Sequence, residues 1–565
     1  NFTNVNDAPT FDNDALLAAV DENTANPPGD TINNLLGSKF QDPDSGASFS
    51  GIAVVGNDLT IPGKWQYSTD GITWSDIGSV DDGTNALALE KDTKVRFLGA
   101  ANYNGTPSLT VRALDNTYTG NFSDNSSTQR IDVSTNGGTS PVSANTNAIA
   151  TTINPIVGVM YVNSNAGGNN DGTSWNDAYT DLQSALAVAN SGDEIWVAQG
   201  TYKPTTTTDR NATFELKDGV AIYGGFVGGE TNEQQRDWQN NVTTLSGDIG
   251  GNGNSDNSYV VITGANGIDS TAILDGFTIS DGNNDNLGRG GGIYNYDASP
   301  TISNVIIINN VASEGGGIYN GFNSSPTLTN ITITNNYVDF GGGIYNVSSS
   351  NPIITNVNIN NNSAEVGGGI YNSGSNPTLT NVQITNNQAR SASGGGIYNS
   401  FNSNPTLTNV TIAKNSAING GGGGIFNNGS NTQINNSIIW DNNSTSETNG
   451  SNTFTNSIVK GSGGSSAWNL GFGTDNGGNL DVDPQFIDPG NEDFHLQATS
   501  PAINTGDNTY LPLDTNDLNS NSNTTEKLPF DLNGNPRIQN SIVDIGAYEL
   551  QPSPGILDEI GRAHV

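Results

Sequence analysis

GGGIYNSGSNPTLTNVQITNN, residues 367–387, decides the fold of this chain. Its opening motif recurs as GGGIYN at 290–295, 315–320, 341–346 and 394–399, and as GGGIFN at 422–427. The isoleucine of the motif therefore returns at intervals of 25, 26, 26, 27 and 28 residues. Each interval holds three short strand-like strings and nothing long or apolar enough for a helix. A repeat of about 25 residues with three strands is one coil of a parallel β-helix, in which equivalent positions stack.

Stacking of the coils predicts columns of like side chains. The motif isoleucines should point inward and the residues after them outward, because side chains alternate along a strand. The outward column contains Tyr294, Tyr319, Tyr345, Tyr371 and Tyr398, and continues to Phe426. These rings could stack on sugar rings. We favour the other interpretation, in which neighbouring aromatic rings stabilise the ladder.

An asparagine separates the second and third strands of each repeat. These turn residues are Asn304, Asn330, Asn356, Asn381 and Asn409. Asparagine tolerates a left-handed φ, and its amide can bond the amide of the next coil. We therefore expect a stacked turn of asparagines along one corner of the rod.

A second repeating feature is charged. Glu314, Asp339 and Glu365 precede glycine triplets at intervals of 25 and 26 residues, and Arg390 follows 25 residues later. Stacked coils would place them in one surface column, where carboxylates about 5 Å apart repel one another. A strip that binds calcium or sugar is one interpretation. A solvated charged corner is the other, and we favour it because surface charges are usually only solvated.

Composition excludes several classes of function. Acidic residues outnumber basic ones by 56 to 18, for a formal net charge of −38. Phosphate binding needs cations, so nucleic acid and anionic membranes are not expected partners. There is no cysteine, which excludes disulfides and thiol chemistry. The only histidines are His495 and His564, and no apolar run approaches the ~20 residues of a membrane span.

Changes in composition and in the hydrophobic pattern divide the chain into four parts. Residues 1–156 alternate like short strands between turns and predict a β-sandwich module. Residues 157–470 form the right-handed parallel β-helix of an all-β chain, with one amphipathic helix at 180–190 that could close its first end. Residues 471–550 could cap the other end, because an open β-helix end is a sheet edge. Residues 551–565 are expected to be a linker and tail.

Three stretches resemble known families. The region from Met160 to Leu470 resembles bacterial pectin-lyase-like β-helix proteins and, more loosely, the repeats of chlamydial polymorphic outer-membrane proteins. The strings DPQF (483–486), SPAIN (500–504), DLNGNPR (531–537) and DIGAYE (544–549) resemble the choice-of-anchor Q domain, although Asn504 stands where that family commonly has Asp. The strings VNDAPTF (5–11) and WQYSTDGITWSDIG (65–78) resemble the cadherin-like modules of giant bacterial adhesins.

These resemblances imply a secreted bacterial cell-surface protein with a structural or adhesin-like role. Its expected partner is an extracellular polysaccharide, or a host or neighbouring cell surface. The cadherin-like resemblance implies calcium, held by Asp7, Glu22, Asp42, Asp44 and Asp115, with acidic turn residues in water as the alternative. The β-helix family also includes polysaccharide lyases and hydrolases, so an enzyme is the alternative function. We assign no catalytic residue, because the coils vary by only a few residues whereas enzymes interrupt such ladders with long loops.

The two ends of the sequence carry their own expectations. The last seven residues, Glu559–Val565, back-translate as GAG ATC GGA AGA GCA CAC GTC, which resembles a common sequencing adapter. We therefore expect a tail of non-biological origin and exclude Arg562 and His564 from functional argument. An ordinary frayed C-terminus is the alternative. The opening VNDAP string predicts a further module before Asn1.

Overall fold

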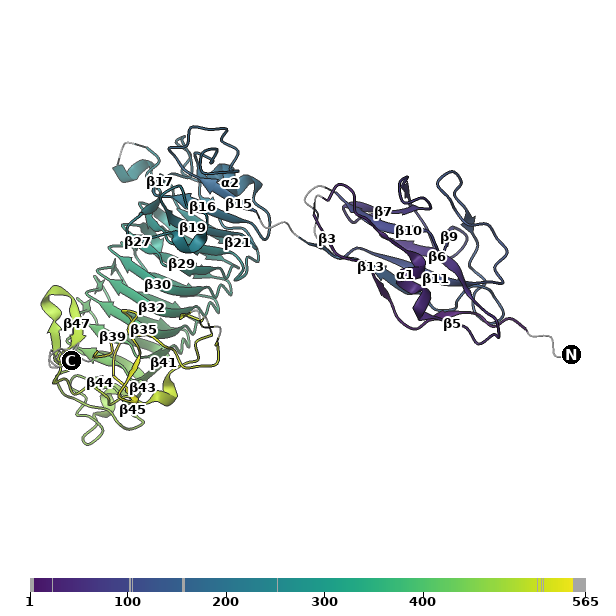
Figure 1. The fold of residues 1–565 in the computed structure, drawn as a ribbon. Helices are drawn as coiled ribbons and strands as arrows, with labels where there is room; N and C mark the ends of the chain where they lie inside the picture. The colour runs from purple at the N-terminus through teal and green to yellow at the C-terminus, as the bar shows by residue number, and fades with distance from the viewer. Residues whose placement is uncertain are drawn as a thin grey trace, which may run out of the picture. The chain divides into compact units, whose positions relative to one another are not determined.

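The structure is a computed structural model. It describes residues 5–22, 24–100, 103, 105–154, 158–250, 253–515, 517–519, 521 and 523–551, apart from the side chains of 285–287. The chain folds as two compact units, Asn1–Val157 and Gly158–Val565 (Figure 1). Among the described residues no helix is long and apolar enough to cross a membrane. The expectation about Glu559–Val565 lies outside the described residues.

The second unit is a right-handed parallel β-helix with three faces, which we call A, B and C in chain order within a repeat. Face A consists of β18 (Phe214–Glu215), β21 (Ile262–Ala265), β25 (Ile293–Tyr296), β29 (Ile318–Gly321), β31 (Ile344–Val347), β34 (Ile370–Ser373), β37 (Ile397–Ser400) and the first residues of β41 (Ile425–Asn435) and β43 (Thr448–Thr455). Each strand pairs in parallel with its equivalent in the next coil, as the repeat predicts.

Face B begins before the repeats. It consists of β15 (Val159–Val162), β16 (Glu194–Ala198), β19 (Ala221–Phe226), β22 (Ile273–Asp275), β26 (Thr301–Ser303), the first halves of β30 (Thr327–Thr334), β32 (Ile353–Asn360) and β35 (Thr378–Thr385), then β38 (Thr406–Thr408), the ends of β41 and β43, and β45 (Thr474–Asp475). Face C consists of β17 (Gly200–Tyr202), β20 (Thr243–Ser246), β23 (Thr278–Ser280), β27 (Ile306–Ile308), the second halves of β30, β32 and β35, then β39 (Thr411–Ala413), β42 (Ile438–Trp440) and β44 (Ile458–Val459).

The interior of the rod is aliphatic. Ile318, Ile344, Ile370 and Ile397 pair in register and have no exposed surface, which confirms the predicted interior column. A buried ladder of amides runs beside it. Its members are Asn295, Asn320, Asn346, Asn372, Asn399 and Asn427. Each donates from Nδ2 to Oδ1 of the next at 2.8–2.9 Å, so these buried amides are paired with one another across the coils.

A short helix covers the first end of the rod. Helix α2 (Leu182–Val188) starts after Asp181, whose side chain accepts a hydrogen bond from the Ser184 amide. Its apolar side chains Leu182 and Leu186 join the core of the coils. It packs against β15 and β18, the first strands of faces B and A. The expected helix therefore forms and covers the interior where the first coils begin.

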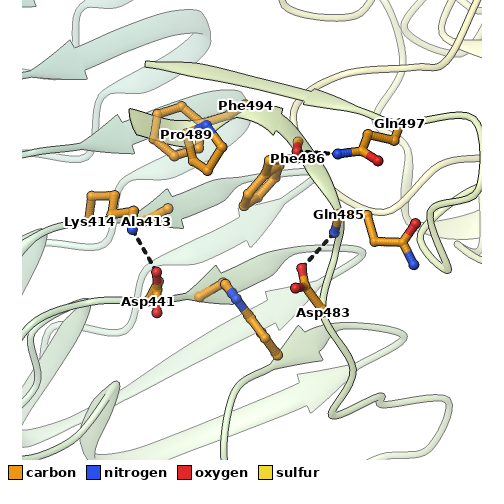
Figure 2. A pocket seen from close by; sticks show the side chains of 10 residues that line it. Ala413, Lys414, Asp441, Asp483, Gln485, Phe486, Pro489, Phe494 and Gln497 are labelled. Carbon is orange, nitrogen blue, oxygen red and sulfur yellow. Dashed lines mark hydrogen bonds and ion pairs between the residues drawn. The ribbon is translucent and has the colours of Figure 1, made fainter. Parts of the chain in front are cut away.

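The C-terminal cap has two parts. Trp468 and Phe472 close the end of the rod, and the Trp468 ring lies 5.3 Å from that of Phe454. Later residues instead run along the side of the last coils. There the hairpin of β46 (Phe486–Asp488) and β47 (Asp493–Leu496) packs Phe486 and Phe494 near Ala413 (Figure 2). This lateral position was not expected, and it follows from apolar outward residues on face C at these coils.

A buried polar cluster holds this lateral part together. Arg537 has no exposed surface and donates to the main-chain oxygens of Asp544, Gly546 and Ala547 at 3.1, 2.5 and 2.9 Å. The buried carboxylates of Asp531, Asp544 and Glu549 accept backbone N–H groups around it. These residues belong to DLNGNPR and DIGAYE, so both strings build the interior of the cap.

The first unit contains two sheets on one core. The six-stranded sheet has the order β12 (Arg130–Ile131), β9 (Ala86–Glu90), β6 (Phe49–Asn57), β11 (Ser108–Asp115), β13 (Asn147–Ala150), β2 (Ala15–Leu16). The four-stranded sheet has the order β4 (Asp30–Thr31), β10 (Lys94–Gly99), β7 (Gly63–Ser68), β8 (Ser75–Asp76). Trp65 and Phe97 of one sheet and Val54 and Val111 of the other share the core.

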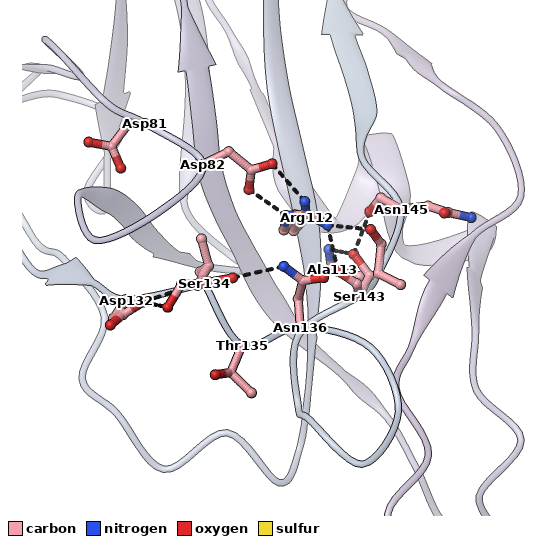
Figure 3. Close-up of polar contacts among 12 residues, drawn as sticks. Asp81, Asp82, Arg112, Ala113, Asp132, Ser134, Thr135, Asn136, Ser143 and Asn145 are labelled. Carbon is pink, nitrogen blue, oxygen red and sulfur yellow. Dashed lines mark hydrogen bonds and ion pairs between the residues drawn. The ribbon is translucent and has the colours of Figure 1, made fainter.

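A buried arginine ties two turns of this unit to the six-stranded sheet. Arg112 of β11 makes a two-pronged ion pair with Asp82 at 2.6 and 2.7 Å (Figure 3). Its Nη1 also donates to the main-chain oxygens of Ser143 and Ala144. Planar, bidentate pairing of this kind fixes geometry as well as charge. The Asp82 carboxylate in Figure 3 therefore has a structural role, because it holds Arg112 in place.

Candidate functional site

The tyrosine column forms on face A as expected. Successive rings from Tyr294 to Phe426 have centroids 4.8–5.6 Å apart and planes inclined by 10–28°. Each of the four inner rings is therefore stacked on both faces by rings of adjacent coils, and the end rings, Tyr294 and Phe426, are each stacked on one face within the column. Stacking on a sugar requires a free ring face, so this geometry fits ladder stabilisation better than sugar binding.

The acidic residues do not form one column. Glu314 stands in register with Phe340, and Phe340 with Val366, so Asp339 and Glu365 lie one position out of line with Glu314. The reason is that Glu314 directly precedes its glycines, whereas one residue separates Asp339 from the next triplet. Two of the three acidic residues form ion pairs with arginines. Glu314 pairs with Arg289 at 2.7 Å, and Glu365 pairs with Arg390 at 2.9 Å. The predicted single column is wrong, and local ion pairs take its place.

Four of the five carboxylates expected to bind calcium lie together. The neighbouring charges that raise the pKa of Asp42, after burial itself, are Asp115, Asp44 and Asp7. The Asp7 amide donates to Asp44 Oδ2 at 2.7 Å, and the Asp44 amide donates to Asp42 Oδ1 at 2.9 Å. Asp42 Oδ2 is buried and has no hydrogen-bond partner.

The fifth predicted ligand, Glu22, is held elsewhere. Its amide donates to the Asn154 main-chain oxygen, beside the short pair of β3 (Val20–Asp21) and β14 (Ile153–Asn154). In the part of the chain that the structure describes, no three acidic or histidine side chains already stand in a metal-binding arrangement. The donor set around Asp42 fits a hard cation in chemistry and in its orphaned oxygen, but its carboxylates bond backbone amides as they stand.

Several hollows lie at the corner between faces B and C, where the asparagine turn runs. Asn304, Asn330 and Asn356 have φ near +55°, as predicted for this turn. Asn330 Nδ2 donates to Asn304 Oδ1 at 3.2 Å, and Asn356 Nδ2 to Asn330 Oδ1 at 3.3 Å. An amide nitrogen carries two N–H groups, so each of these residues keeps one donor for another partner.

The same corner is covered further along. Asn330 is exposed, Asn356 is 8% exposed, and Asn381 and Asn409 are fully buried. The cap covers the buried pair: Asn381 Nδ2 donates to the Phe530 main-chain oxygen and Asn409 Nδ2 to that of Asp544. Along this turn the asparagine side chains are therefore accessible at Asn304 and Asn330 and buried from Asn356 to Asn409.

Three adjoining hollows, of about 380, 340 and 600 Å³, line this open part, which we call the asparagine-corner groove. Trp238 and Gln239 bound it toward the first coils, and Leu532, Gly534 and Tyr548 toward the cap. Hydroxyl side chains from faces B and C complete the lining: Thr301, Ser303, Thr327, Thr329 and Thr332. Trp238 lines two of the three hollows.

Charged groups at the groove are already paired. Asp275 accepts hydrogen bonds from Asn304 Nδ2 at 2.9 Å and from the Ser303 hydroxyl, and it forms an ion pair with Arg236 at 2.6 Å. At the cap side, Asn533 Nδ2 donates to His495 Nε2. The other ring nitrogen, Nδ1, lies 2.6 Å from Asp493 Oδ1. The rest of the lining combines amides, hydroxyls and the Trp238 indole with the carboxylate of Asp517 and with apolar side chains.

The sequence predicts only part of this site. It identifies Asn304, Asn330 and Asn356 as turn residues, but it does not indicate Trp238 or the cap residues that bound the groove. Trp238 lies in a loop between β19 and β20 that belongs to no repeat, and Tyr548 reaches the coils only through the lateral fold of the cap. A tryptophan in a polar, non-repeating loop was the one available signal.

Comparison with known proteins supports the fold. The family model described as the right-handed β-helix region matches residues 249–412. No curated protein matches the chain by sequence. Among solved structures, pectate lyase Pel9A is 15% identical, with 70% of this chain and 96% of that chain covered and a TM-score of 0.40. The family 28 exopolygalacturonase of Yersinia enterocolitica is 11% identical, with 78% and 84% covered and a TM-score of 0.19. The family model and the parallel strand pairing of the coils agree on a right-handed parallel β-helix.

Proposed function

We propose that this chain is an extracellular, surface-displayed protein that binds a neutral polysaccharide in the asparagine-corner groove. The observation that carries this proposal is the row of exposed, amide-lined coils bounded at one end by the indole of Trp238. Amide and hydroxyl groups exchange hydrogen bonds with sugar hydroxyls, and an unpaired indole face packs against the C–H groups of a pyranose.

The spacing of the groove supports a chain-like ligand. Coils of a β-helix repeat at about 4.8 Å, so equivalent amide donors recur along the groove at that interval. An extended pyranose chain advances by a similar length per sugar. Each sugar could then meet one coil, and the rigid ladder would hold the donors in place without an ordering cost at the moment of binding.

Charge supports a neutral glycan over an acidic one. The chain carries a net charge of −38, and Arg236, the basic residue beside the groove, is occupied by Asp275 and Glu233 at 2.6 Å each. A uronate polymer would approach an acidic protein with no available cation to meet its carboxylates. The alternative function is that of a polysaccharide lyase or hydrolase. Release of oligosaccharide from the polymer would distinguish it from binding alone.

A polysaccharide array read for both retained protein and released sugar tests this proposal. We expect retention on neutral glucans, xylans or mannans, weak retention on pectin and alginate, and no released oligosaccharide. Trp238→Ala should weaken retention about tenfold, the effect of losing one stacking contact. Tyr371→Leu on face A is the matched control and should leave it unchanged. Retention that depends on Tyr371 and not on Trp238 would contradict the groove, and released unsaturated products would favour the lyase.

We also propose that the first unit binds calcium through Asp7, Asp42, Asp44 and Asp115. The buried, unpartnered Oδ2 of Asp42 supports this, because a buried carboxylate oxygen without a partner is costly. Calcium would add positive charge among these carboxylates and would be held by six to eight oxygens at about 2.3–2.6 Å. Glu22 lies beside Asn154 and is not part of this set.

A further inference from the structure

The repeat pattern breaks at one place in the coils. The residue after the third strand is Asn309, Asn335, Asn361 and Asn386 in successive coils, always with left-handed φ. The next two coils keep that backbone conformation but carry Lys414 and Asp441. The outward residue just before this corner changes as well. It is Thr334, Asn360, Thr385 and Ala413 in register, and then Trp440. Departures from a repeat that folds well without them mark places where something other than folding has shaped the sequence.

These unusual residues face the lateral part of the cap across a cavity of about 220 Å³ (Figure 2). Ala413, Lys414, Trp440 and Asp441 line it from the coils. The cap contributes Asp483, Gln485, Phe486, Pro489, Phe494 and Gln497. The volume is below the roughly 300–1,000 Å³ of sites for larger ligands, so it suits a single ring.

The indole of Trp440 lines the cavity and is partly buried against the apolar cluster that includes Ala413. The Lys460 ammonium, from the following coil, lies 5.6 Å from its ring centroid. Its neighbour in the preceding coil is Ala413, which carries only a methyl group. Beside it, Phe486 and Phe494 supply an apolar wall.

The polar groups of the cavity are balanced in charge. Asp441 accepts hydrogen bonds from Lys414 at 2.6 Å and from Lys460 at 2.5 Å. The lining itself holds one ammonium, Lys414, and two carboxylates, Asp441 and Asp483. Lys460 lies outside the lining and pairs with Asp441, so the four groups together have a formal charge of zero. The amide groups of Gln485 and Gln497 each have one end already bonded, Oε1 of Gln485 to Thr499 and Nε2 of Gln497 to the Phe486 main-chain oxygen. Their other ends, one donor and one acceptor, remain for a ligand.

We propose that this cavity is a second carbohydrate site, which binds one neutral pyranose ring against Trp440. The indole packs on the apolar face of the ring, and Asp441, Asp483, Gln485 and Gln497 bond its hydroxyl groups. Aromatic packing on one side with carboxylate and amide partners around the rim matches a sugar, which has C–H groups on its face and hydroxyls on its edge. The site is separate from the asparagine-corner groove and does not depend on it.

Fluorine NMR of the full chain labelled with 5-fluorotryptophan tests this proposal. The sequence contains seven tryptophans, and Trp440→Phe and Trp238→Phe assign the two resonances that matter. We expect millimolar methyl glucopyranoside, galactopyranoside or mannopyranoside to move the Trp440 resonance saturably. Asp441→Asn should weaken that response at least about tenfold, since it removes a charged hydrogen-bond acceptor. The other resonances and the melting temperature report whether that variant remains folded.

The same spectrum separates the two sugar proposals, because Trp238 reports the groove and Trp440 the cavity. A Trp440 resonance that stays fixed with every neutral glycoside would overturn this proposal, whatever Trp238 does. A Trp440 response to galacturonate alone would overturn the neutral class of ligand. In Asp441→Asn two lysines face one aspartate, so a gain of galacturonate response in that variant would support the charge argument.

Discussion

The tyrosine column of face A and the asparagine corner each contribute one residue per coil. Only the asparagine corner keeps functional groups that a ligand could contact. Rings from Tyr294 to Phe426 stack within 4.8–5.6 Å of one another, so their faces are consumed by the ladder. The asparagine corner bonds along its own column too, but it is accessible at Asn304 and Asn330 and covered by the cap at Asn381 and Asn409. A repeated residue is a candidate for binding when no other part of the chain covers its side chain. Repetition alone does not make it one.

Two asparagine substitutions should give the largest contrast. Asn372→Ala removes one rung of the buried ladder, leaving Asn346 Nδ2 without its acceptor and Asn399 Oδ1 without its donor. Each unpaired buried group costs about 1–3 kcal/mol, so we expect a loss of about 2–6 kcal/mol in the free energy of unfolding. Asn330→Gly keeps the positive φ of the exposed corner and should cost less than about 1 kcal/mol. Urea denaturation followed by circular dichroism measures both.

The matched outcome for these variants concerns binding. Asn330→Gly should lower polysaccharide affinity, because it removes an amide from the groove. A stability loss at Asn330 as large as that at Asn372 would mean that the exposed corner is a structural ladder like the buried one. The distinction drawn between the two columns would then fail.

The regular coils were predictable because one residue per coil repeats at nearly constant spacing. Ile344 and Tyr345 could therefore be assigned to opposite sides of the sheet from the sequence alone. The acidic column was misaligned because a one-residue difference in the turn before the glycines shifts Asp339 relative to Glu314. The groove could not be predicted because Trp238 and Tyr548 come from segments without a repeat, far from Asn330 in the chain. The local sequence of neither segment indicates which coils it will contact.

Buried acids sharpen the comparison between the two units. In the cap, burial raises the pKa of Glu549 to about 7, with Arg537 opposing the shift. The folded state then keeps its proton at higher pH than the unfolded chain, whose ordinary value is 4.5. Stability from this group is therefore greatest below about pH 4.5 and falls as pH rises to about 7, by about 3 kcal/mol at most.

The melting temperature of the second unit should accordingly fall between about pH 5 and 7. Glu549→Gln should flatten that slope. Raised pKa values of Asp544 and Glu447, both caused by burial, act in the same direction and remain in the variant. A melting temperature that rises over this range in the wild type, or a slope that Glu549→Gln leaves unchanged, would show that Glu549 is ionised in the folded cap.

In the first unit, the neighbouring charges that shift the pKa of Asp42 are all carboxylates. Calcium should therefore raise the melting temperature of this unit, because a ligand that binds only the folded state stabilises it. The gain is about 2.7 kcal/mol at a hundredfold excess over Kd. Asp42→Asn should remove most of the response, whereas Glu22→Gln should retain it. Calorimetry of the full chain in millimolar calcium and in chelator measures it; equal transitions in both would remove the metal.

Blocking the groove tests the central claim most directly. The chain has no cysteine, so a single cysteine can carry a bulky maleimide polymer at a chosen position. Thr332→Cys places it in the groove, and Ser373→Cys places it beside the tyrosine column; both side chains are half-buried on outward strand positions. We predict that labelling at 332 abolishes binding of a soluble neutral polysaccharide, while labelling at 373 leaves it intact. Binding that survives the label at 332 and is lost with the label at 373 would contradict the groove and return the function to face A.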